Sequence, residues 1–507
     1  MDKRKSILNV SVSIGFKLIT LVAVILVKRF LIRYCGNDIN GLNALYTSII
    51  GTLSIAELGV GSAITFCMYK PIVEQDLNTV SALYHLFRRL YLIIGGVILA
   101  CGVLLSPYIT YFAKDYAELK VDFQLTFLLM LISVVVTYCF AAKTSLINAY
   151  KNNYITTAIS SGGILLQYAL QIVVLLLTGS FVWYLVCRIV AVLLQWLITE
   201  LVAHRKHDSI LQNRQALSAP VKKEVVKNIK AMFMHKIGAV FVNAMDGVVI
   251  SAFVGVVSLG MYSNYTMILT SMTEIIKLVF TSLTSVVGHL FVEENKETSQ
   301  KYCERFHLLN FVLGCVFFLG YYGIVENLVA LLFAEEVIVT KTIAFVMTLN
   351  GFVQFMRQSV LMFRGATGTF YHDRWKPLFE GLTNLVLSLL LVQWIGVVGV
   401  LLSTLITSLL ICHVIEPYVL YKHAFQASPK KFYIKNYGMI GIFAFMLLLL
   451  HYCMQALDNR WAELLVNGFI SVGISLTVCA LVFACNRDFR EWLLANIKRK
   501  SQKKTQT

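Results

Sequence analysis

The feature that most constrains this chain is a succession of apolar runs, each long enough to cross a lipid bilayer as a helix of roughly 20 residues. The runs recur from one end of the 507 residues to the other, with no intervening stretch long enough for a soluble domain. Hydrophobic residues make up 58% of the chain and charged residues 14%, too few to cover a water-soluble fold. The sequence therefore predicts an all-α polytopic membrane protein.

About fourteen transmembrane helices are predicted from the length of these runs. They span residues 11–32, 42–69, 84–106, 124–147, 155–177, 181–202, 233–256, 261–290, 306–333, 339–363, 377–393, 395–416, 436–457 and 461–485. The division at 393–395 depends on Gly396 and Gly399 alone. The first run follows Lys3-Arg4-Lys5 but is too long for a signal peptide, so we expect a retained helix.

The distribution of basic residues predicts the orientation of these helices. With a cytoplasmic N-terminus, the basic loop residues fall almost entirely on the cytoplasmic side, as the positive-inside rule requires. The loops predicted to lie outside hold little beyond Lys114, Lys120 and Arg460. Both termini are therefore predicted to be cytoplasmic, in a bacterial plasma membrane, and one missed helix would invert half of the pattern.

Several other classes of function are excluded by composition. The net charge of +17 is spread over short loops and tails, so we expect no nucleic-acid partner. Most of the eleven cysteines lie inside apolar runs without CxxC spacing, so neither a disulfide nor a metal site is predicted. The sequence has no GxxxxGK[ST] motif, and no cofactor is expected. Transport would then draw on a proton gradient, a sodium gradient or the membrane potential.

An internal repeat predicts the domain organisation. Gly36–Gly41 followed by Tyr46-Thr47 resembles Gly255–Gly260 followed by Tyr265-Thr266, at a constant offset of 219 residues. Each copy lies between the first two helices of a six-helix unit, so the units should be related by a pseudo-two-fold axis along the membrane normal. The predicted parts are a lobe at 1–203, a linker at 204–232, a lobe at 233–423, and two further helices with a basic tail at 424–507. An amphipathic run at 221–230 in the linker is either an interfacial helix or a solvated connection.

Charged residues inside a membrane span are candidate functional groups, because burying a charge in lipid is unfavourable. The first span contains Lys17, Lys28 and Arg29. Eleven residues return a helix to within about 20° of the same direction and advance it by about 16 Å, so Lys17 and Lys28 share one stripe. We expect that stripe to face an aqueous cavity; the alternative for each cation is that its side chain reaches the nearer membrane interface.

Later spans hold three more candidate cavity cations, Arg188, Arg357 and Arg364. Arg357 and Arg364 are seven residues apart and share one helix face, although Arg364 falls near the inner loop. Lys143 lies close to the cytoplasmic end of its span, where anchoring at the interface is the favoured interpretation.

Three acids, Glu57, Asp246 and Glu274, are candidate coupling or gating groups within the spans. Glu274 has Lys277 three residues later, so a simple i,i+3 pair is an equal alternative. The repeat offset places Asp246 at the position equivalent to Val27, next to Lys28. We therefore hypothesise that an acid and a base at nearly equivalent positions form a gate between the lobes.

An excess of cations in the cavity favours an anionic substrate. A lipid diphosphate carries two or more negative charges, which lysine and arginine bind well. Polar and aromatic residues within the spans, such as Asn43, Tyr168 and Gln354, could bind sugars, although hydrogen bonding between helices is the likelier use of any one of them.

Several segments resemble those of a known transporter family. They are Gly41–Ala63 with its Ala56-Glu57-Leu58-Gly59 block, Tyr69-Lys70-Pro71, Asp246 with Ile250–Gly255, Gly260–Thr266, Arg364–Gly368 and Gly396–Val400. Together they resemble the Wzx-type polysaccharide and O-antigen flippases, of the Gram-positive capsule and exopolysaccharide type. These belong to the multidrug/oligosaccharidyl-lipid/polysaccharide exporter superfamily. Two details depart from the pattern: His289 replaces an expected small polar amide, and the loop Ala334–Glu336 lacks a tryptophan-glycine pair.

The resemblance implies a MATE-like bundle of two six-helix lobes plus two C-terminal helices. It implies outward transfer of undecaprenyl-diphosphate-linked oligosaccharide repeat units by alternating access, for capsule or exopolysaccharide assembly. The polysaccharide polymerase machinery would then be a partner. A lipid II flippase or a multidrug exporter of the same superfamily is the alternative. A membrane-bound polymerase or ligase is not favoured, because the longest outer loop, about 107–123, is short and contains no histidine.

Overall fold

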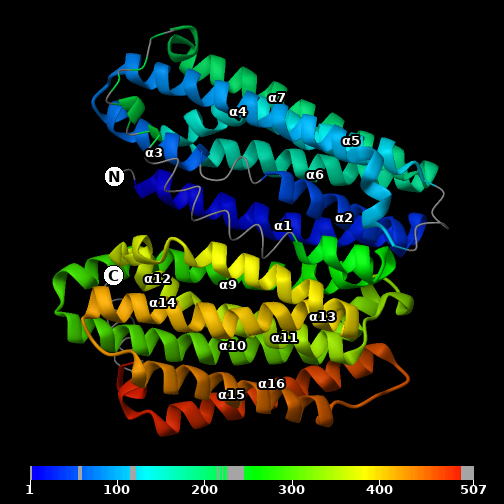
Figure 1. Ribbon diagram of the computed structural model, residues 1–507, viewed down its shortest axis with the longest axis vertical. Coiled ribbons are helices and arrows are strands. Elements are labelled where there is room, and N and C mark those ends of the chain that lie inside the picture. The colour runs from blue at the N-terminus through cyan, green and yellow to red at the C-terminus, as the bar shows by residue number, and fades with distance from the viewer. Residues whose placement is uncertain are drawn as a thin grey trace. The chain divides into compact units, whose positions relative to one another are not determined.

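The computed structural model describes residues 3–54, 60–114, 121–213 and 245–492, with a few positions between 215 and 226. Within these residues every regular element is a helix (Figure 1). Glu57, most of the linker and the C-terminal tail lie outside the described residues, as do the side chains of Lys17 and His289. The predictions made for those groups stay predictions.

The chain divides into two compact units. The first contains the described residues up to Ser263 together with Pro377–Gly396, and the second contains Asn264–Lys376 and the described residues from Val397 onward. These bounds differ from those of the predicted lobes, which rest on the repeat and remain a prediction.

The first unit is built from long helices joined by short turns. They are α1 (Lys3–Cys35), α2 (Asn37–Leu53), α3 (Val60–Val73), α4 (Leu77–Leu105), the short η2 (Ser106–Phe112), α5 (Phe123–Ala149), α6 (Asn153–Thr178) and α7 (Phe181–Gln212). Residues 245–253 are also helical. The helix α9 (Val256–Glu293) begins in this unit and continues into the second.

The second unit continues with α10 (Lys296–Leu332), η4 (Glu335–Val337), α11 (Lys341–Met356), α12 (Gln358–Thr367) and η5 (Thr369–Asp373). The helix α13 (Lys376–Thr407) is followed by η6 (Ser408–Cys412), α14 (His413–Leu420) and η7 (Tyr421–Phe425), and then by α15 (Lys430–Cys453) and α16 (Arg460–Cys485). Helices thus lie at the fourteen predicted spans wherever the structure describes them. The span 42–69 holds parts of α2 and α3, and the span 339–363 holds α11 and part of α12.

The break at 393–395 is confirmed as a kink. Inside α13 the backbone leaves the helical region at Ile395 and reaches a positive φ of 57° at Gly396. Glycine tolerates that conformation because it has no Cβ. The kink divides α13 into the two predicted spans without a loop, and the boundary between the compact units falls at the same point.

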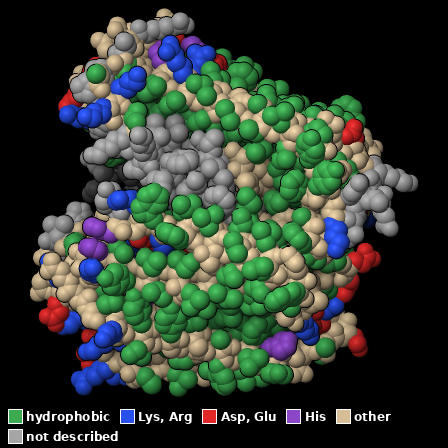
Figure 2. All heavy atoms as spheres, viewed as in Figure 1, with side chains coloured by type: hydrophobic (Ala, Val, Ile, Leu, Met, Phe, Trp, Pro, Cys, Tyr) green, Lys and Arg blue, Asp and Glu red, His purple; other side chains and the backbone are tan. Residues whose placement is uncertain are grey.

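Exposed apolar side chains show that the helices are suited to lipid rather than water. In the described part of the chain, eight helical segments of 24 to 50 residues are long and apolar enough to cross a membrane. Many large hydrophobic side chains on them are exposed, including Trp394 at 82% and Leu177 at 78%. Figure 2 shows hydrophobic side chains over the middle of the visible helices and charged side chains toward their ends. Such banding is expected of a multi-pass membrane protein.

Within the second unit, α16 packs on its neighbours through small residues and α15 packs through an aromatic ring. A side chain at Gly323 of α10 would press on the backbone of Asn467 and the side chain of Ser471, both on α16. On α15, the ring of Phe443 stacks on that of Phe352, with the centroids 3.6 Å apart. Close approach through glycine and serine is typical of helix packing in membranes.

Candidate functional site

We call the end of the first unit that carries the turn between α1 and α2 its outer end, after the side of the membrane predicted for it. Lys28 lies near this end. Its Nζ donates a hydrogen bond of 2.9 Å to the Oγ of Ser263 on α9. Among the described residues no carboxylate lies within ion-pair distance of this ammonium. Lys28 and Asp246 form no ion pair in the described structure, and the gate that we hypothesised for them stays a prediction.

Arg188 on α7 is the second cation of the first unit without an acidic partner. Its side chain is partly buried, and within the described chain no carboxylate lies within 4.0 Å of its guanidinium group. A guanidinium group in this setting keeps its donors available for an anion.

Lys28 and Arg188 lie at a similar depth. The outer end of α1 is joined to the turn between α6 and α7 by a hydrogen bond of 3.3 Å from Cys35 Sγ to the carbonyl oxygen of Gly179, the C-cap of α6. Lys28 is seven residues inward of Cys35, and Arg188 is seven residues inward of Phe181, where α7 begins. At 1.5 Å per residue, each cation lies about 10 Å from the outer end of its helix.

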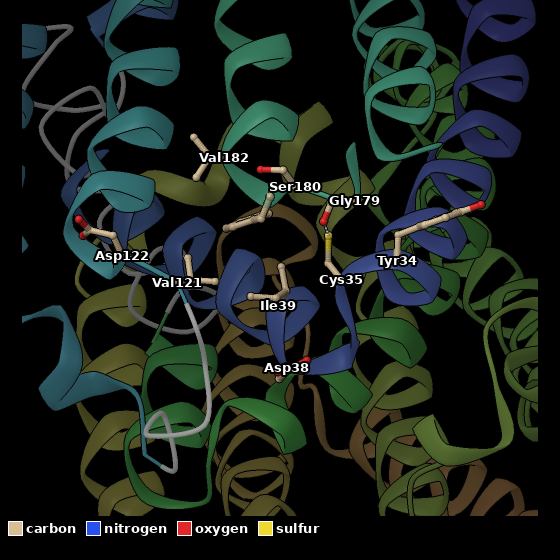
Figure 3. A pocket seen from close by; sticks show the side chains of 10 residues that line it. Tyr34, Cys35, Asp38, Ile39, Val121, Asp122, Gly179, Ser180 and Val182 are labelled. Atoms are coloured by element: carbon tan, nitrogen blue, oxygen red, sulfur yellow. Dashed lines mark hydrogen bonds between the residues drawn. The ribbon is translucent and has the colours of Figure 1, made fainter. Parts of the chain in front are cut away.

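An open pocket at the outer end of the first unit has a different chemistry (Figure 3). Its volume is about 430 Å³, and its lining includes Tyr34, Cys35, Asp38, Asp122 and Ser180. Asp122 also caps α5 by accepting a hydrogen bond from the backbone of Leu125. None of the predicted cavity cations lines this pocket. These cations therefore do not make it a binding site for an anion.

Three further predicted site residues lie on α1, on the 245–253 helix and on α9: Arg29, Asp246 and Glu274. Arg29 is exposed, beside Lys28. Asp246 is buried, at 9% exposure, in the helical segment 245–253. Glu274 lies 3.6 Å from Lys277, and both side chains are 43% exposed. That pair is the simple i,i+3 alternative.

Arg357 and Arg364 do share a site, but carboxylates occupy it with them. Glu416 of α14 is 1% exposed and accepts two hydrogen bonds from Arg357, of 2.6 and 3.1 Å. Lys376 donates to the same carboxylate at 2.6 Å, while Arg364 pairs with Asp373. The three cations of this cluster thus share two acids of the second unit.

Sequence reasoning missed Glu416, Asp373 and Lys376. The signal was a glutamate at the end of an apolar run, beside Pro417, in the last residue of a predicted span. The partners of Glu416 come from the junction between α11 and α12, from α12 and from the start of α13, up to 59 residues away in the chain. No local pattern links such residues, so the cluster could not be assembled from spacing alone.

The first unit contains a comparable ion pair. Lys143 of α5 is 8% exposed and bonds to Glu200 of α7. Glu200 also accepts from His204 at 3.2 Å. At the repeat offset of 219 residues, α5 aligns with α11–α12 and α7 aligns with the segment that contains α14. Arg364 of α12 lies 3.6 Å from Glu416 of α14 in addition to its pair with Asp373, so a cation and a glutamate lie together at both places.

The internal repeat corresponds to a physical contact within the first unit. A methyl group at Gly41 would overlap the carbonyl oxygen of Val256, and one at Gly260 would overlap that of Asn37. Gly41 and Gly260 are equivalent at the offset of 219, as are Asn37 and Val256. The contact is therefore reciprocal. Gly36 and Gly255, also equivalent, both have positive φ, at 91° and 134°.

Sequence comparison finds no relative. No protein-family model matches the chain, and no curated protein matches it.

Solved structures do share its fold. A lipid II flippase MurJ in an inward closed conformation aligns with a TM-score of 0.67 at 14% identity, covering 94% of this chain and 99% of that chain. An inward-facing multidrug resistance MATE transporter of the MOP superfamily aligns at 0.59 and 13%, covering 81% and 97%. A MOP transporter from Pyrococcus furiosus aligns at 0.53 and 13%, covering 84% and 96%. This chain is a multi-pass membrane protein with the all-helical fold of these flippases and transporters.

Proposed function

We propose that this protein is a flippase that moves undecaprenyl-diphosphate-linked oligosaccharide repeat units from the inner to the outer leaflet by alternating access. Capsule or exopolysaccharide assembly is the proposed setting. The fold shared with MurJ and MATE transporters supports a transporter rather than an enzyme. The segments that resemble Wzx-type flippases support the substrate class.

One observation carries the proposal: Lys28 and Arg188 lie at a similar depth with no carboxylate partner among the described residues. Two cations with unused donors can neutralise the two or more charges of a diphosphate. Lys17, eleven residues inward of Lys28 on the same stripe, would be a third contact along the path. We assign Arg357 and Arg364 to structure rather than substrate, because Glu416 and Asp373 already neutralise them.

A lipid II flippase is the second candidate. The MurJ structure aligns over 94% of this chain, and the substrate in its name carries the same class of diphosphate lipid. The two candidates share the cation site and differ in the sugar. A multidrug exporter would bind cationic drugs and would require acids where Lys28 and Arg188 lie.

The proposal also includes the source of energy, the cellular location and a partner. Asp246 is buried, so it is our candidate for binding a proton or a sodium ion, together with Glu57. The bacterial plasma membrane is the proposed location, with both termini in the cytoplasm. A polysaccharide polymerase would receive the product at the outer face.

The first prediction tests the two cations. Lys28→Gln and Arg188→Gln should each lower the initial rate of transfer by about tenfold or more, since each removes a charge-assisted contact with the diphosphate. The measurement is transfer of an undecaprenyl-diphosphate-linked oligosaccharide by purified protein in liposomes. Arg33→Gln is the matched control, because Arg33 is an exposed cation on the same helix as Lys28.

Three outcomes count against the proposal. Both glutamine variants could transfer the lipid at the normal rate, or the control could lose as much activity as they do. The unmodified protein could also transport only cationic dyes. Comparing the oligosaccharide lipid with lipid II as substrate decides between the two flippase candidates.

A further inference from the structure

The hydrogen bond of Lys28 joins it to the reciprocal glycine contact. Ser263 accepts from Lys28, and its own hydroxyl donates to the carbonyl oxygen of Gly260 at 2.8 Å. Gly260 is one of the two glycines at which the repeat copies touch. Through the side chain of Ser263, the Lys28 ammonium group is therefore linked to the backbone at which the two repeat copies touch, at the outer end of the first unit.

Asn40 strengthens the same connection from α2. Its Nδ2 lies 3.1 Å from the carbonyl oxygen of Gly260 and 3.4 Å from Ser263 Oγ, and it is 2% exposed. One helical turn earlier, Asn37 donates to the carbonyl oxygen of Val257 at 3.0 Å. Side chains of α1 and α2 therefore bind three successive polar groups at the start of α9.

We propose that Ser263 and Asn40 are positioning residues that couple the occupancy of Lys28 to this contact. Without substrate, Lys28 donates to Ser263 and helps to hold α1 and α2 against the start of α9. A phosphate oxygen is a stronger acceptor than a neutral hydroxyl, because charge-assisted hydrogen bonds are roughly twice as strong. A bound diphosphate therefore draws Nζ away from Ser263 and weakens the contact at the outer end.

The inference rests on the proposed function for its ligand, and on the observed hydrogen bonds for its mechanism. It explains why a membrane-buried lysine faces a serine rather than a carboxylate. A salt bridge would compete strongly with the phosphate, whereas a hydroxyl satisfies the ammonium and releases it readily.

The test measures how often the contact opens. In a variant that lacks the eleven native cysteines, Leu259→Cys places a thiol that is buried at the start of α9, next to Gly260, and purified protein in nanodiscs is labelled with a maleimide. Ser263→Ala should raise the labelling rate by about tenfold, as expected for the loss of one hydrogen bond to a charged group. Ser263→Thr retains the hydroxyl and should restore the slow rate.

Ser258→Ala is the matched control, because Ser258 lies on α9 five residues before Ser263 and makes none of these bonds. Its labelling rate should equal that of the parent. Undecaprenyl diphosphate should raise the rate in the parent and in the control, but not in Ser263→Ala or in Lys28→Gln.

The outcomes separate the coupling from the proposed function. If undecaprenyl diphosphate binds the parent but Ser263→Ala labels at the parent rate, the coupling is overturned and the proposed substrate stands. If the lipid does not bind the parent at all, the proposed substrate fails, and the ligand-driven half of the coupling fails with it. Fast labelling of Ser263→Thr would also contradict the role of the hydroxyl.

Discussion

At the scale of single residues, the informative property of a membrane-buried cation is whether an acid accompanies it. Arg357, Arg364 and Lys376 share Glu416 and Asp373, and Lys143 has Glu200. Among the residues that the structure describes, Lys28 has only the hydroxyl of Ser263 as a partner. The sequence identifies a charge inside a span, but it cannot identify a partner on another helix, so Lys28, Arg357 and Arg364 were all predicted to be cavity cations.

A buried carboxylate that serves three cations should be important for stability. Glu416→Gln leaves Arg357 and Lys376 without their anion, and breaking a buried ion pair from one side costs about 3–5 kcal/mol. We expect a clearly lower unfolding temperature of the purified protein in detergent, measured by intrinsic fluorescence.

The control for Glu416→Gln is Glu336→Gln, which alters an exposed acid of η4 in the same unit. It should leave the unfolding temperature unchanged. Equal unfolding temperatures for the two variants would contradict the structural role that we assign to the cluster, and would return Arg357 to the list of substrate contacts.

At the scale of elements, a glycine sets how closely two helices approach only where its missing side chain faces a neighbouring helix. Gly96 of α4 has open space where a side chain would point, whereas Gly260 of α9 lies against the backbone of Asn37. The same residue type therefore has a structural requirement in one helix and none in another. The repeat in the sequence indicated the important pair before any contact was known.

Replacing Gly260 or Gly96 by alanine should show which of the two glycines is required for stability. Gly260→Ala forces the start of α9 away from α2 and breaks the hydrogen bonds from Asn37 and Asn40, so we expect a loss of about 1–3 kcal/mol of stability. Gly96→Ala should be neutral or slightly stabilising, because alanine is the better helix former. Thermal unfolding of both variants in the same detergent measures the difference.

One outcome of the unfolding measurements would contradict the prediction for Gly260. If Gly260→Ala and Gly96→Ala unfold at the same temperature, the close contact between the repeat copies does not contribute to stability.

At the scale of the whole molecule, orientation depends on the parity of the helix count. With fourteen spans, the turn between α15 and α16 lies outside and the turn between α9 and α10 lies inside, given a cytoplasmic N-terminus. Both turns contain exposed residues, among them Asp458 and Glu294.

Labelling of single cysteines in intact cells tests this orientation. In a cysteine-free variant, Asp458→Cys should react with a membrane-impermeant maleimide added outside, and Glu294→Cys should react only after the membrane is permeabilised. Both substitutions lie in exposed turns, so each is the other's control. The reverse pattern would place the termini outside and invert the proposed direction of transfer.

The sequence by itself determined the helical membrane fold, the number of spans, the break before Gly396 and the equivalence of Gly41 with Gly260. These follow from the length of apolar runs and from constant spacing, which are local or periodic properties. Only the tertiary structure decided which cations are neutralised, because Glu416 reaches Arg357 across 59 residues. It also decided that Lys28 meets Ser263, 235 residues later. Pairing between helices depends on how they pack, and no spacing in the chain encodes it.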